Sequence, residues 1–379
     1  MLARVQEPRE RLASCARRRP GSSLEDAGSI PATSTLENAQ ADGLGIRAFR
    51  VWDFLKTRPA CLDRGRAWRI ARSPTSCIMS ETRPVSYLPP LRNPVRTIGG
   101  RTFDFDHEIV VMGIVNRTPD SFVDQGRTYA LDQAVAAALA AAQAGAGWVD
   151  IGGVPFSPDT PEVTVTEEID RVVPVIEQVA AQSDIVISVD TFRPEVAARG
   201  IAAGAAVIND TSGLHDPEMA DVVATHGATV VITHSLAPPR HHHRPKYIDI
   251  VTEIKAFLAE RVQLAVDHGV PESRIVIDPG HDLNKNTLHT LELTRRLTEV
   301  ADLGLPMLAA VSNKDFVGEA TGLSTSDRMP PSIAAATMCV LNGARILRMH
   351  DVAASVAAAR MMEAVMGLHQ PAHLHHNMS

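Results

Sequence analysis

Eight short apolar segments recur along the chain from residue 105 onward, and they constrain the fold more than any other feature. Between them lie Ala-rich or amphipathic stretches with helical character, such as 131–144 and 167–181. Eight strand–helix units over about 260 residues match a TIM (β/α)8 barrel, and we predict this α/β fold. A doubly wound sheet is the alternative, but no Gly-x-Gly-x-x-Gly turn supports it. The predicted strands are 109–115, 148–151, 185–189, 205–208, 229–233, 274–277, 307–311 and 345–348.

Polar side chains end or directly follow each predicted strand. Taken alone, an Asp or Asn in such a position is usually a helix cap. In a barrel, however, all eight strand ends meet at one mouth, so these groups predict a polar site there. Buried carboxylates in such a site need hydrogen-bonding ligands or cations. The residues are Asn116, Asp150, Asp190, Asn209, His234, Asp278, Lys314, Arg348 and His350.

The charge of the chain changes at Met79. The segment before it contains 14 Lys and Arg against 8 Asp and Glu, a net +6; the whole chain carries −7, so the remainder carries −13. Residues 1–78 lack hydrophobic periodicity and an apolar signal-peptide core. We expect either a disordered extension or a spurious one, with translation starting at Met79. The other predicted parts are a lead-in segment at 79–106, the barrel at 107–368 and a disordered His-rich tail at 369–379.

Composition argues against several classes of function. A net charge of −7 gives no electrostatic support for binding nucleic acid. No apolar run reaches the ~20 residues that a membrane span requires. Of four cysteines only Cys339 follows Met79, so the chain has no disulfide framework. We therefore expect a cytoplasmic protein.

Seven motifs lie at the ends of the predicted strands or just after them, in chain order. They are 112–116 (Met-Gly-Ile-Val-Asn), 118–122 (Thr-Pro-Asp-Ser-Phe), 150–153 (Asp-Ile-Gly-Gly), 188–191 (Ser-Val-Asp-Thr), 209–210 (Asn-Asp), 278–280 (Asp-Pro-Gly) and 348–352 (Arg-Met-His-Asp-Val). Each alone is a weak signal. Together, over residues 107–366, they resemble the motifs of dihydropteroate synthases.

That family condenses 6-hydroxymethyl-7,8-dihydropterin diphosphate with p-aminobenzoate, and diphosphate leaves with the help of Mg²⁺. The resemblance implies that Asp190, Asn209, Asp278 and Lys314 bind the pterin, with Asp150 nearby. The chemistry agrees, because a pterin edge presents N–H donors and a carbonyl that carboxylates, an amide and an ammonium group can pair.

The resemblance also assigns the diphosphate end of the site. Arg348 and His350 would donate to the diphosphate, and Asn116 could be a ligand of the Mg²⁺ cofactor. Lys314 and Arg348 would be the catalytic residues, and Arg348 could also stack on the pterin ring.

The second loop departs from the family. After the Asp-Ile-Gly-Gly motif the family continues Glu-Ser-Thr-Arg-Pro-Gly, where this chain has Val-Pro-Phe-Ser-Pro-Asp at 154–159. In the family the Thr contributes to the p-aminobenzoate pocket and the Arg binds the diphosphate. Here the two positions are Phe156 and Ser157. Loss of a hydrogen bond to a charged group costs about 1.5–3 kcal/mol, which predicts weaker activity.

Three later loops depart as well. The family motif Ser-Arg-Lys-Ser is Ser-Asn-Lys-Asp at 312–315, so Asp315 would put a negative charge at the helix start that receives the p-aminobenzoate carboxylate. We expect Asp315 to satisfy the amides of that helix start. The sixth loop, usually Gly-Ile-Gly-Phe-Gly-Lys, is Gly-His-Asp-Leu-Asn-Lys at 280–285. After the fifth strand the usual Met-His-Met is Thr233-His234-Ser235.

Three functions remain open at this point. The first is a dihydropteroate synthase-like pterin-binding protein with weak or absent activity, similar to the divergent second dihydropteroate synthase paralogue of actinobacteria. The second is a working dihydropteroate synthase with an altered second loop, which requires Phe156 and Asp315 to face away from the substrate. The third is a non-catalytic regulatory partner. We also expect a homodimer, since family members dimerise through their late helices.

Overall fold

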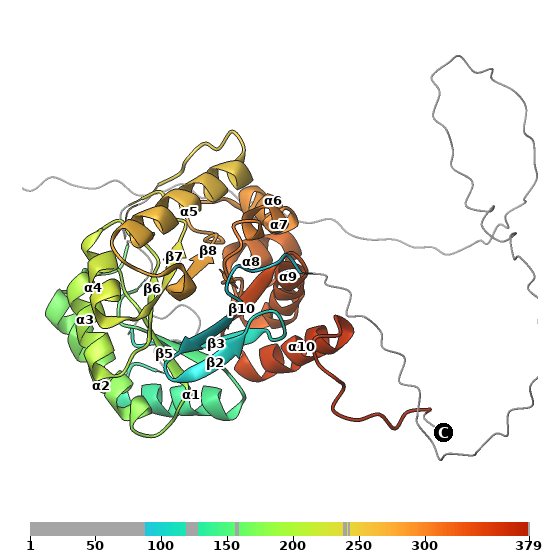
Figure 1. The fold of residues 1–379 in the computed structure, drawn as a ribbon, viewed down its shortest axis with the longest axis horizontal. Helices are drawn as coiled ribbons and strands as arrows, with labels where there is room; N and C mark the ends of the chain where they lie inside the picture. The colour runs from blue at the N-terminus through green and yellow to red at the C-terminus, as the bar shows by residue number, and fades with distance from the viewer. Residues whose placement is uncertain (1–87, 119–127, 156–158, 238–240, 242, 378–379) are drawn as a thin grey trace, which may run out of the picture. The chain divides into compact units, whose positions relative to one another are not determined.

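The computed structural model describes residues 88–118, 128–155, 159–237, 241 and 243–377. Eight parallel strands form a closed barrel in the order β10-β3-β4-β5-β6-β7-β8-β9, surrounded by helices (Figure 1). The predicted TIM barrel is therefore confirmed. The strands are β3 (Val110–Asn116), β4 (Trp148–Gly152), β5 (Val186–Asp190), β6 (Val207–Asp210), β7 (Thr229–Thr233), β8 (Ile275–Asp278), β9 (Met307–Ala309) and β10 (Ala344–Met349).

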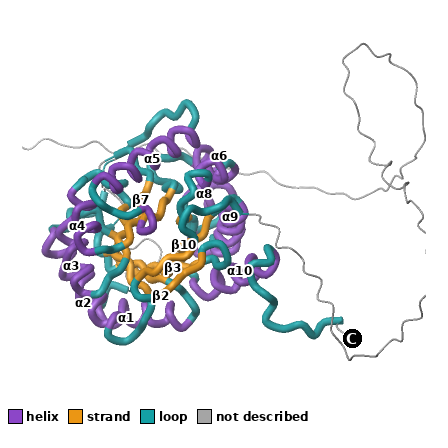
Figure 2. The backbone as a smooth tube through the Cα atoms, viewed as in Figure 1, coloured by secondary structure: helices purple, strands orange, loops and turns teal. Residues whose placement is uncertain are grey.

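The helices form the outer layer of the barrel (Figure 2). Helix α2 begins two residues before its predicted start, because the Thr164 hydroxyl accepts the Glu167 amide at 3.2 Å and caps the helix there. The helices are α1 (Leu131–Gln143), α2 (Val165–Ala180), α3 (Pro194–Ala203), α4 (Glu218–His226), α5 (Ile250–Asp267), α6 (Thr287–Arg295), α7 (Leu297–Ala301), α8 (Asp315–Thr321), α9 (Met329–Leu341) and α10 (Val352–Val365).

Two hydrophobic cores hold the barrel. The larger one lies between the strands and the helices and includes Cys339 of α9, which is fully buried. The smaller one fills the barrel interior, where each strand contributes one buried side chain to an apolar layer. This interior layer consists of Met112, Trp148, Val186, Val207, Val231, Val276, Leu308 and Ile346.

The lead-in segment closes the end of the barrel that lies opposite the carboxyl ends of the strands. It forms an antiparallel hairpin of β1 (Val95–Ile98) and β2 (Arg101–Asp104). Phe103 and Phe105, in and just after β2, are buried against the interior layer. The buried guanidinium of Arg345 in β10 donates to the Phe105 carbonyl at 2.7 Å. The hairpin is thus packed as part of the barrel, which leaves the opposite end as the mouth.

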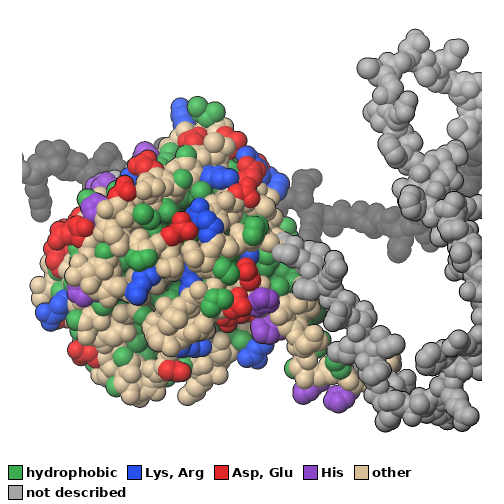
Figure 3. All heavy atoms as spheres, in the orientation of Figure 1, with side chains coloured by type: hydrophobic (Ala, Val, Ile, Leu, Met, Phe, Trp, Pro, Cys, Tyr) green, Lys and Arg blue, Asp and Glu red, His purple; other side chains and the backbone are tan. Residues whose placement is uncertain are grey.

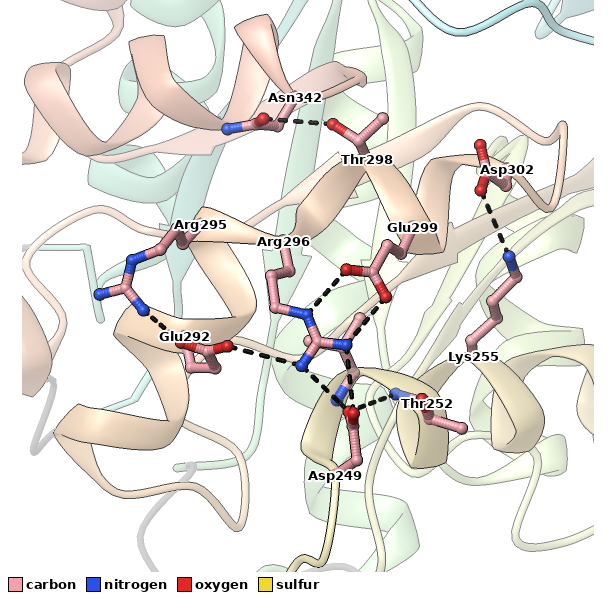
Figure 4. A network of polar contacts seen from close by, with 11 residues as sticks. Asp249, Thr252, Lys255, Glu292, Arg295, Arg296, Thr298, Glu299, Asp302 and Asn342 are labelled. Atoms are coloured by element: carbon pink, nitrogen blue, oxygen red, sulfur yellow. Dashed lines mark hydrogen bonds and ion pairs between the residues drawn. The ribbon is translucent and has the colours of Figure 1, made fainter. Parts of the chain in front are cut away.

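The outer surface carries charges of both signs, interspersed over the face that Figure 3 shows. One surface network joins the start of α5 to the junction of α6 and α7 (Figure 4). There Arg296 donates to Glu299 at 2.7 Å and to Asp249 at 3.2 Å, and Asp249 caps α5. These side chains are 28% to 47% exposed, so the pairs add little stability. Within the described ranges, no helix is long and apolar enough to cross a membrane.

Candidate active site at the barrel mouth

Polar side chains form the next layer of the barrel interior, toward the carboxyl ends of the strands. Each lies two residues beyond a residue of the apolar interior layer, and strand residues two apart point to the same face. Asp150 follows Trp148 in this way, and Asn209 follows Val207. This polar layer consists of Asp150, Ser188, Asn209, Thr233, Asp278 and Arg348, all buried except the partly exposed Arg348.

Asp150 is the hub of the polar layer. Its fully buried carboxylate accepts hydrogen bonds from Ser188 Oγ at 2.6 Å, Asn209 Nδ2 at 2.9 Å and Arg348 Nε at 2.7 Å. Nη2 of the same guanidinium donates to Asp190 at 3.0 Å. The structure thus brings together four of the residues predicted for the site. Ser188 was not among them, although its position two residues before Asp190 on one strand face is a signal that could have found it.

Burial and repulsion shift the pKa values in this cluster. Burial raises the pKa of Asp190 to about 7, and the neighbouring charge of Asp150 adds to the effect while Arg348 opposes it. For Arg348, burial lowers the pKa, but the attraction of the two carboxylates outweighs burial and the net shift is upward. Two carboxylates therefore share one guanidinium. A ligand that offers N–H donors would complete their hydrogen bonding.

Asp278 and Lys314 add a second pair of charges to the mouth. Asp278 Oδ1 accepts the Gly280 amide at 2.7 Å. Burial raises the pKa of Asp278, and the Gly280 amide and the nearby Lys314 ammonium oppose the shift. Burial likewise lowers the pKa of Lys314, against the attraction of Asp282 and Asp278. The two predicted pterin-binding residues are therefore within electrostatic reach of each other.

His234 does not point into the mouth, contrary to the expectation from its place at a strand end. Its ring lies 4.9 Å from the Phe257 ring, and its Nδ1 lies 2.9 Å from Lys285 Nζ. Strand alternation explains this, because Thr233 occupies the inward position and the next residue faces outward. Lys285 also donates to the Gly280 and Leu283 carbonyls at 2.8 and 2.9 Å, so it holds the sixth loop together.

His350 and Asn116 lie at the ends of two adjacent strands, β10 and β3. The Nδ1 of His350 lies 3.0 Å from Ser312 Oγ, and its backbone N–H donates to the same hydroxyl at 3.1 Å. Asn116 is half-buried, and its carbonyl accepts the Thr128 hydroxyl at 2.6 Å. The side-chain oxygen of Asn116 lies beside Gly152, where an added Cβ would be 3.5 Å away, an ordinary contact.

The sixth loop has a left-handed backbone at three residues, two of which are not glycine. Gly280, Asp282 and Asn284 have φ values of +67°, +65° and +53°. Asp and Asn tolerate the left-handed region better than other residues with side chains. At 282 and 284 this chain therefore adds a side chain where the family has glycine. Asp282 uses its carboxylate to accept the Thr290 hydroxyl at 3.1 Å and the Phe316 amide at 3.3 Å.

The prediction that Asp315 satisfies the amides at the start of α8 is wrong. The Asp315 carboxylate is 80% exposed and pairs with Arg328 at 3.3 Å. It is the sixth-loop carboxylate of Asp282 that accepts the Phe316 amide. Asp282 can reach this amide because its left-handed backbone turns the side chain toward α8, whereas Arg328 draws the Asp315 side chain away.

The loop that carries Lys314 is braced from behind by the start of α9. Asn313 has a φ of +56°, its amide donates to Ser332 Oγ at 3.0 Å, and its carbonyl accepts Arg328 Nη1 at 3.1 Å. The guanidinium lies on Gly318, where an added Cβ would come within 2.3 Å of it. Arg328 and Ser332 were not predicted from the sequence. No local pattern connects them to a loop more than ten residues away.

Some predicted positions lie outside the described residues. They are Phe156 and Ser157 of the second loop and residues 119–122 of the first. Thr118, the first residue of that motif, is described and buried.

Comparison with known proteins identifies the family. A model of the family described as pterin binding enzyme matches residues 112–350. The chain is 36% identical to the dihydropteroate synthase of Escherichia coli K12 over 268 residues, which are 70% of this chain and 95% of the relative. It is 40% identical over 285 residues to the inactive dihydropteroate synthase 2 of Mycobacterium tuberculosis H37Rv, with 73% and 88% of the two chains covered.

Solved structures agree with this assignment. The dihydropteroate synthase of Xanthomonas albilineans with 4-aminobenzoic acid is 41% identical and superimposes with a TM-score of 0.67, covering 72% of this chain and 98% of that one. The same enzyme has a structure in complex with 7,8-dihydropteroate, with a TM-score of 0.65. The fold, the polar mouth and these similarities lead to one assignment: the chain belongs to the dihydropteroate synthase family of pterin-binding enzymes.

Proposed function

We propose that this protein binds a 7,8-dihydropterin diphosphate at the barrel mouth but condenses it with p-aminobenzoate weakly or not at all. The observation that carries this proposal is the polar layer together with Asp190. Buried Asp150 and Asn209 and the partly exposed Asp190 and Arg348 form one hydrogen-bonded cluster, and its two carboxylates share a single guanidinium. Buried charges of this kind are destabilising unless a ligand uses them.

The polar layer, with Asp190 and Lys314 beside it, suits the edge of a pterin ring. Carboxylates of Asp190 and Asp278 would accept ring and exocyclic N–H groups, and Lys314 would donate to the ring carbonyl. Among the described residues, Asn209 Oδ1 is buried and has no hydrogen-bond partner, so it is an acceptor left for a ligand. We assign these residues, with Asp150 as their support, to pterin binding.

The diphosphate would lie toward β10 and β3. Arg348 and His350 supply donors there, and Arg348 would exchange part of its bonding from carboxylate to phosphate. Among the described residues, no group of three His, Cys, Asp or Glu could hold a metal ion. One amide oxygen, from Asn116, fits a Mg²⁺ ion that arrives with the diphosphate, because Mg²⁺ usually binds through substrate phosphates and few protein oxygens. Bound Mg²⁺ would neutralise charge on the leaving group.

The part of the site that would bind p-aminobenzoate, here called the p-aminobenzoate half-site, differs from the family. The carboxylate of Asp282 accepts the Phe316 amide, at the helix start that the family uses for the substrate carboxylate. A second carboxylate would meet an amide already bonded and a like charge. The loss of the family Arg at Ser157 adds to this effect.

An active dihydropteroate synthase is the second candidate, and one observation favours it. Asp315 faces Arg328 and solvent, as an active enzyme would require. Asp282 stands against this candidate because it brings a carboxylate to the same helix start.

We also propose a homodimer formed through the outer faces of α9 and α10, which lie side by side (Figure 1). Four apolar side chains on these helices are 45% to 68% exposed: Met338, Leu341, Met361 and Val365. Such a patch on adjacent helices is typical of a subunit interface. Met361→Glu should halve the mass measured by sedimentation equilibrium, and an unchanged mass would place the interface elsewhere.

Calorimetric titration of the full chain with 6-hydroxymethyl-7,8-dihydropterin diphosphate and Mg²⁺ tests pterin binding. The wild type should bind, and Asp190→Asn should weaken binding at least tenfold by removing a charged acceptor. Asp302→Asn is the matched control, because this carboxylate lies on the surface beside Lys255. No binding by the wild type would reject the proposed function. Equal affinity of wild type and Asp190→Asn would remove Asp190 from the site.

A further inference from the structure

The Thr233 hydroxyl lies in the polar layer, and no described residue hydrogen-bonds to it. Thr233 ends β7 and is fully buried. It is one of the few buried side chains in the described part of the chain with a polar atom, here Oγ1, that lacks a hydrogen-bond partner. Its side chain points into the barrel, because Val231, two residues earlier on β7, belongs to the apolar interior layer.

The position of Thr233 is set by its neighbours. Thr233 pairs in register with Asp278 of β8, whose carboxylate faces the same side. The following residue is held by a hydrogen bond of 2.8 Å from its amide to the Asp278 carbonyl. Gly213 packs so closely on Thr233 that an added Cβ would lie 2.5 Å from the Thr233 carbonyl. The strand end is therefore fixed, and the hydroxyl stays inside the barrel.

A buried hydroxyl without a partner costs stability, so its presence needs a reason. Valine has the same shape and would fill this position without that cost. On the adjacent strand β6, Asn209 Oδ1 is also buried and unpartnered among the described residues. Two unused polar atoms thus lie on neighbouring strands, in the same layer as the charged residues of the site.

We propose that Thr233 is a specificity-determining residue, whose hydroxyl hydrogen-bonds the bound ring beside Asn209. This inference rests on the proposed function and deepens it. Asn209 Oδ1 can only accept, whereas the Thr233 hydroxyl can donate or accept. The ligand edge that faces β6 and β7 must therefore carry an N–H group next to a further polar atom. A nitrogen heterocycle such as a pterin meets this requirement, and a hydrocarbon ring does not. Family members usually have Met here, which offers no comparable hydrogen bond.

The test is calorimetric titration of the full chain with 6-hydroxymethyl-7,8-dihydropterin. Thr233→Val, which keeps the shape and removes the hydroxyl, should weaken affinity about three- to tenfold, the worth of one hydrogen bond. Thr233→Ser should retain most of the affinity. Thr229→Val is the matched control, because Thr229 is a buried threonine at the opposite end of the same strand, away from the mouth.

Thermal unfolding without ligand supplies a second measurement. Thr233→Val should unfold at the same temperature as the wild type or higher, because it removes an unsatisfied polar atom. If this variant does not fold, Thr233→Ala, which lacks the hydroxyl, can be compared with Thr233→Ser, which keeps it. Wild-type binding with equal affinity in the variants without the hydroxyl would overturn the role of Thr233 alone. No binding by the wild type would overturn the proposed function and this inference with it.

Discussion

On β4, β5, β6 and β10 the polar groups of the mouth project from strands, whereas those after β8 and β9 come mainly from loops. On this strand side, Asp150, Asp190, Asn209 and Arg348 bond to one another and repeat the family motifs. The loop side consists of residues 280–285 and 312–315, where three residues other than glycine have φ above +50°. The family pattern is changed on this side.

The difference between the two sides indicates where this protein has changed its chemistry. A strand-side residue is coupled to the barrel core, so its replacement disturbs packing as well as binding. A loop residue can change without such a penalty, provided that the backbone conformation is kept. Asp282 follows this rule, because it keeps the left-handed conformation suited to glycine and adds a carboxylate. The strand side, which we propose binds the pterin, thus keeps the family motifs, while the loop side, proposed for p-aminobenzoate, is altered.

The largest effect is expected from breaking the strand side. Arg348→Met leaves Asp150 and Asp190 without their shared cation, which should destabilise the fold by about 3–5 kcal/mol and abolish pterin binding. Urea unfolding followed by Trp fluorescence measures the first effect. Arg296→Met is the control, because the ion pairs of the network in Figure 4 are solvent-exposed and should contribute little to stability. Equal losses in the two variants would contradict the distinction between buried and exposed pairs.

The next largest effect is expected from substitutions on the loop side. Adding Asp282→Gly to Ser157→Arg and Asp315→Ser should raise p-aminobenzoate-dependent turnover by roughly tenfold over the double variant, the worth of a charged hydrogen bond. Glycine suits the φ of +65° at this position. Asn284 is the loop's other left-handed residue that is not glycine. Asn284→Gly removes no carboxylate, so it should not increase turnover. A gain from Asn284→Gly as large as that from Asp282→Gly would mean that the loop backbone, and not the carboxylate, limits the reaction.

Pterin affinity, which we expect to depend on the strand side, should change with pH by a similar factor. Burial raises the pKa of Asp190 to about 7, and in the proposed function its ionised form would accept the pterin N–H groups. Affinity should therefore rise roughly tenfold from pH 6 to pH 8 and level off above. The stability that this group contributes has the opposite sign: it is present at low pH and is lost as pH rises through 7. Calorimetry across this range should give a flat profile for Asp190→Asn.

The smallest effect concerns the brace behind Lys314. Arg328→Ala removes the donors to the Asn313 and Lys314 carbonyls, at 3.1 and 3.3 Å, so the loop should lose its fixed position. We expect pterin affinity to fall about threefold, with partial recovery in Arg328→Lys. Arg295→Ala is the control, because Arg295 pairs with Glu292 on the surface. An unchanged affinity in Arg328→Ala would show that Lys314 is positioned without the brace.

The sequence predicted the barrel because apolar periodicity and the eightfold repeat report directly on strands and helices. It also predicted most of the strand side, since residues at strand ends must meet at the mouth. The direction of the other side chains near these strand ends depends on strand alternation. This alternation turns Ser188 and Thr233 inward and His234 outward, although a residue next to a strand end has no obvious direction in the sequence.

The loop side could not be predicted from neighbouring residues. Asp282 and Phe316 are 34 positions apart, and their contact depends on a left-handed backbone that the sequence pattern does not reveal. The brace of Arg328 on Gly318 is likewise a contact between side chain and backbone across α8. Asp315 looked like a helix cap because it begins a helix, but the ion pair with Arg328 draws its carboxylate away.

In the proposed function the protein binds the pterin diphosphate but condenses it weakly or not at all. The most direct test supplies the purified full chain with 6-hydroxymethyl-7,8-dihydropterin diphosphate, Mg²⁺ and p-aminobenzoate, and quantifies dihydropteroate by chromatography beside the Escherichia coli enzyme. We expect little or no product from protein that binds the pterin diphosphate in a parallel titration. Turnover comparable to that of the Escherichia coli enzyme would contradict the proposed function.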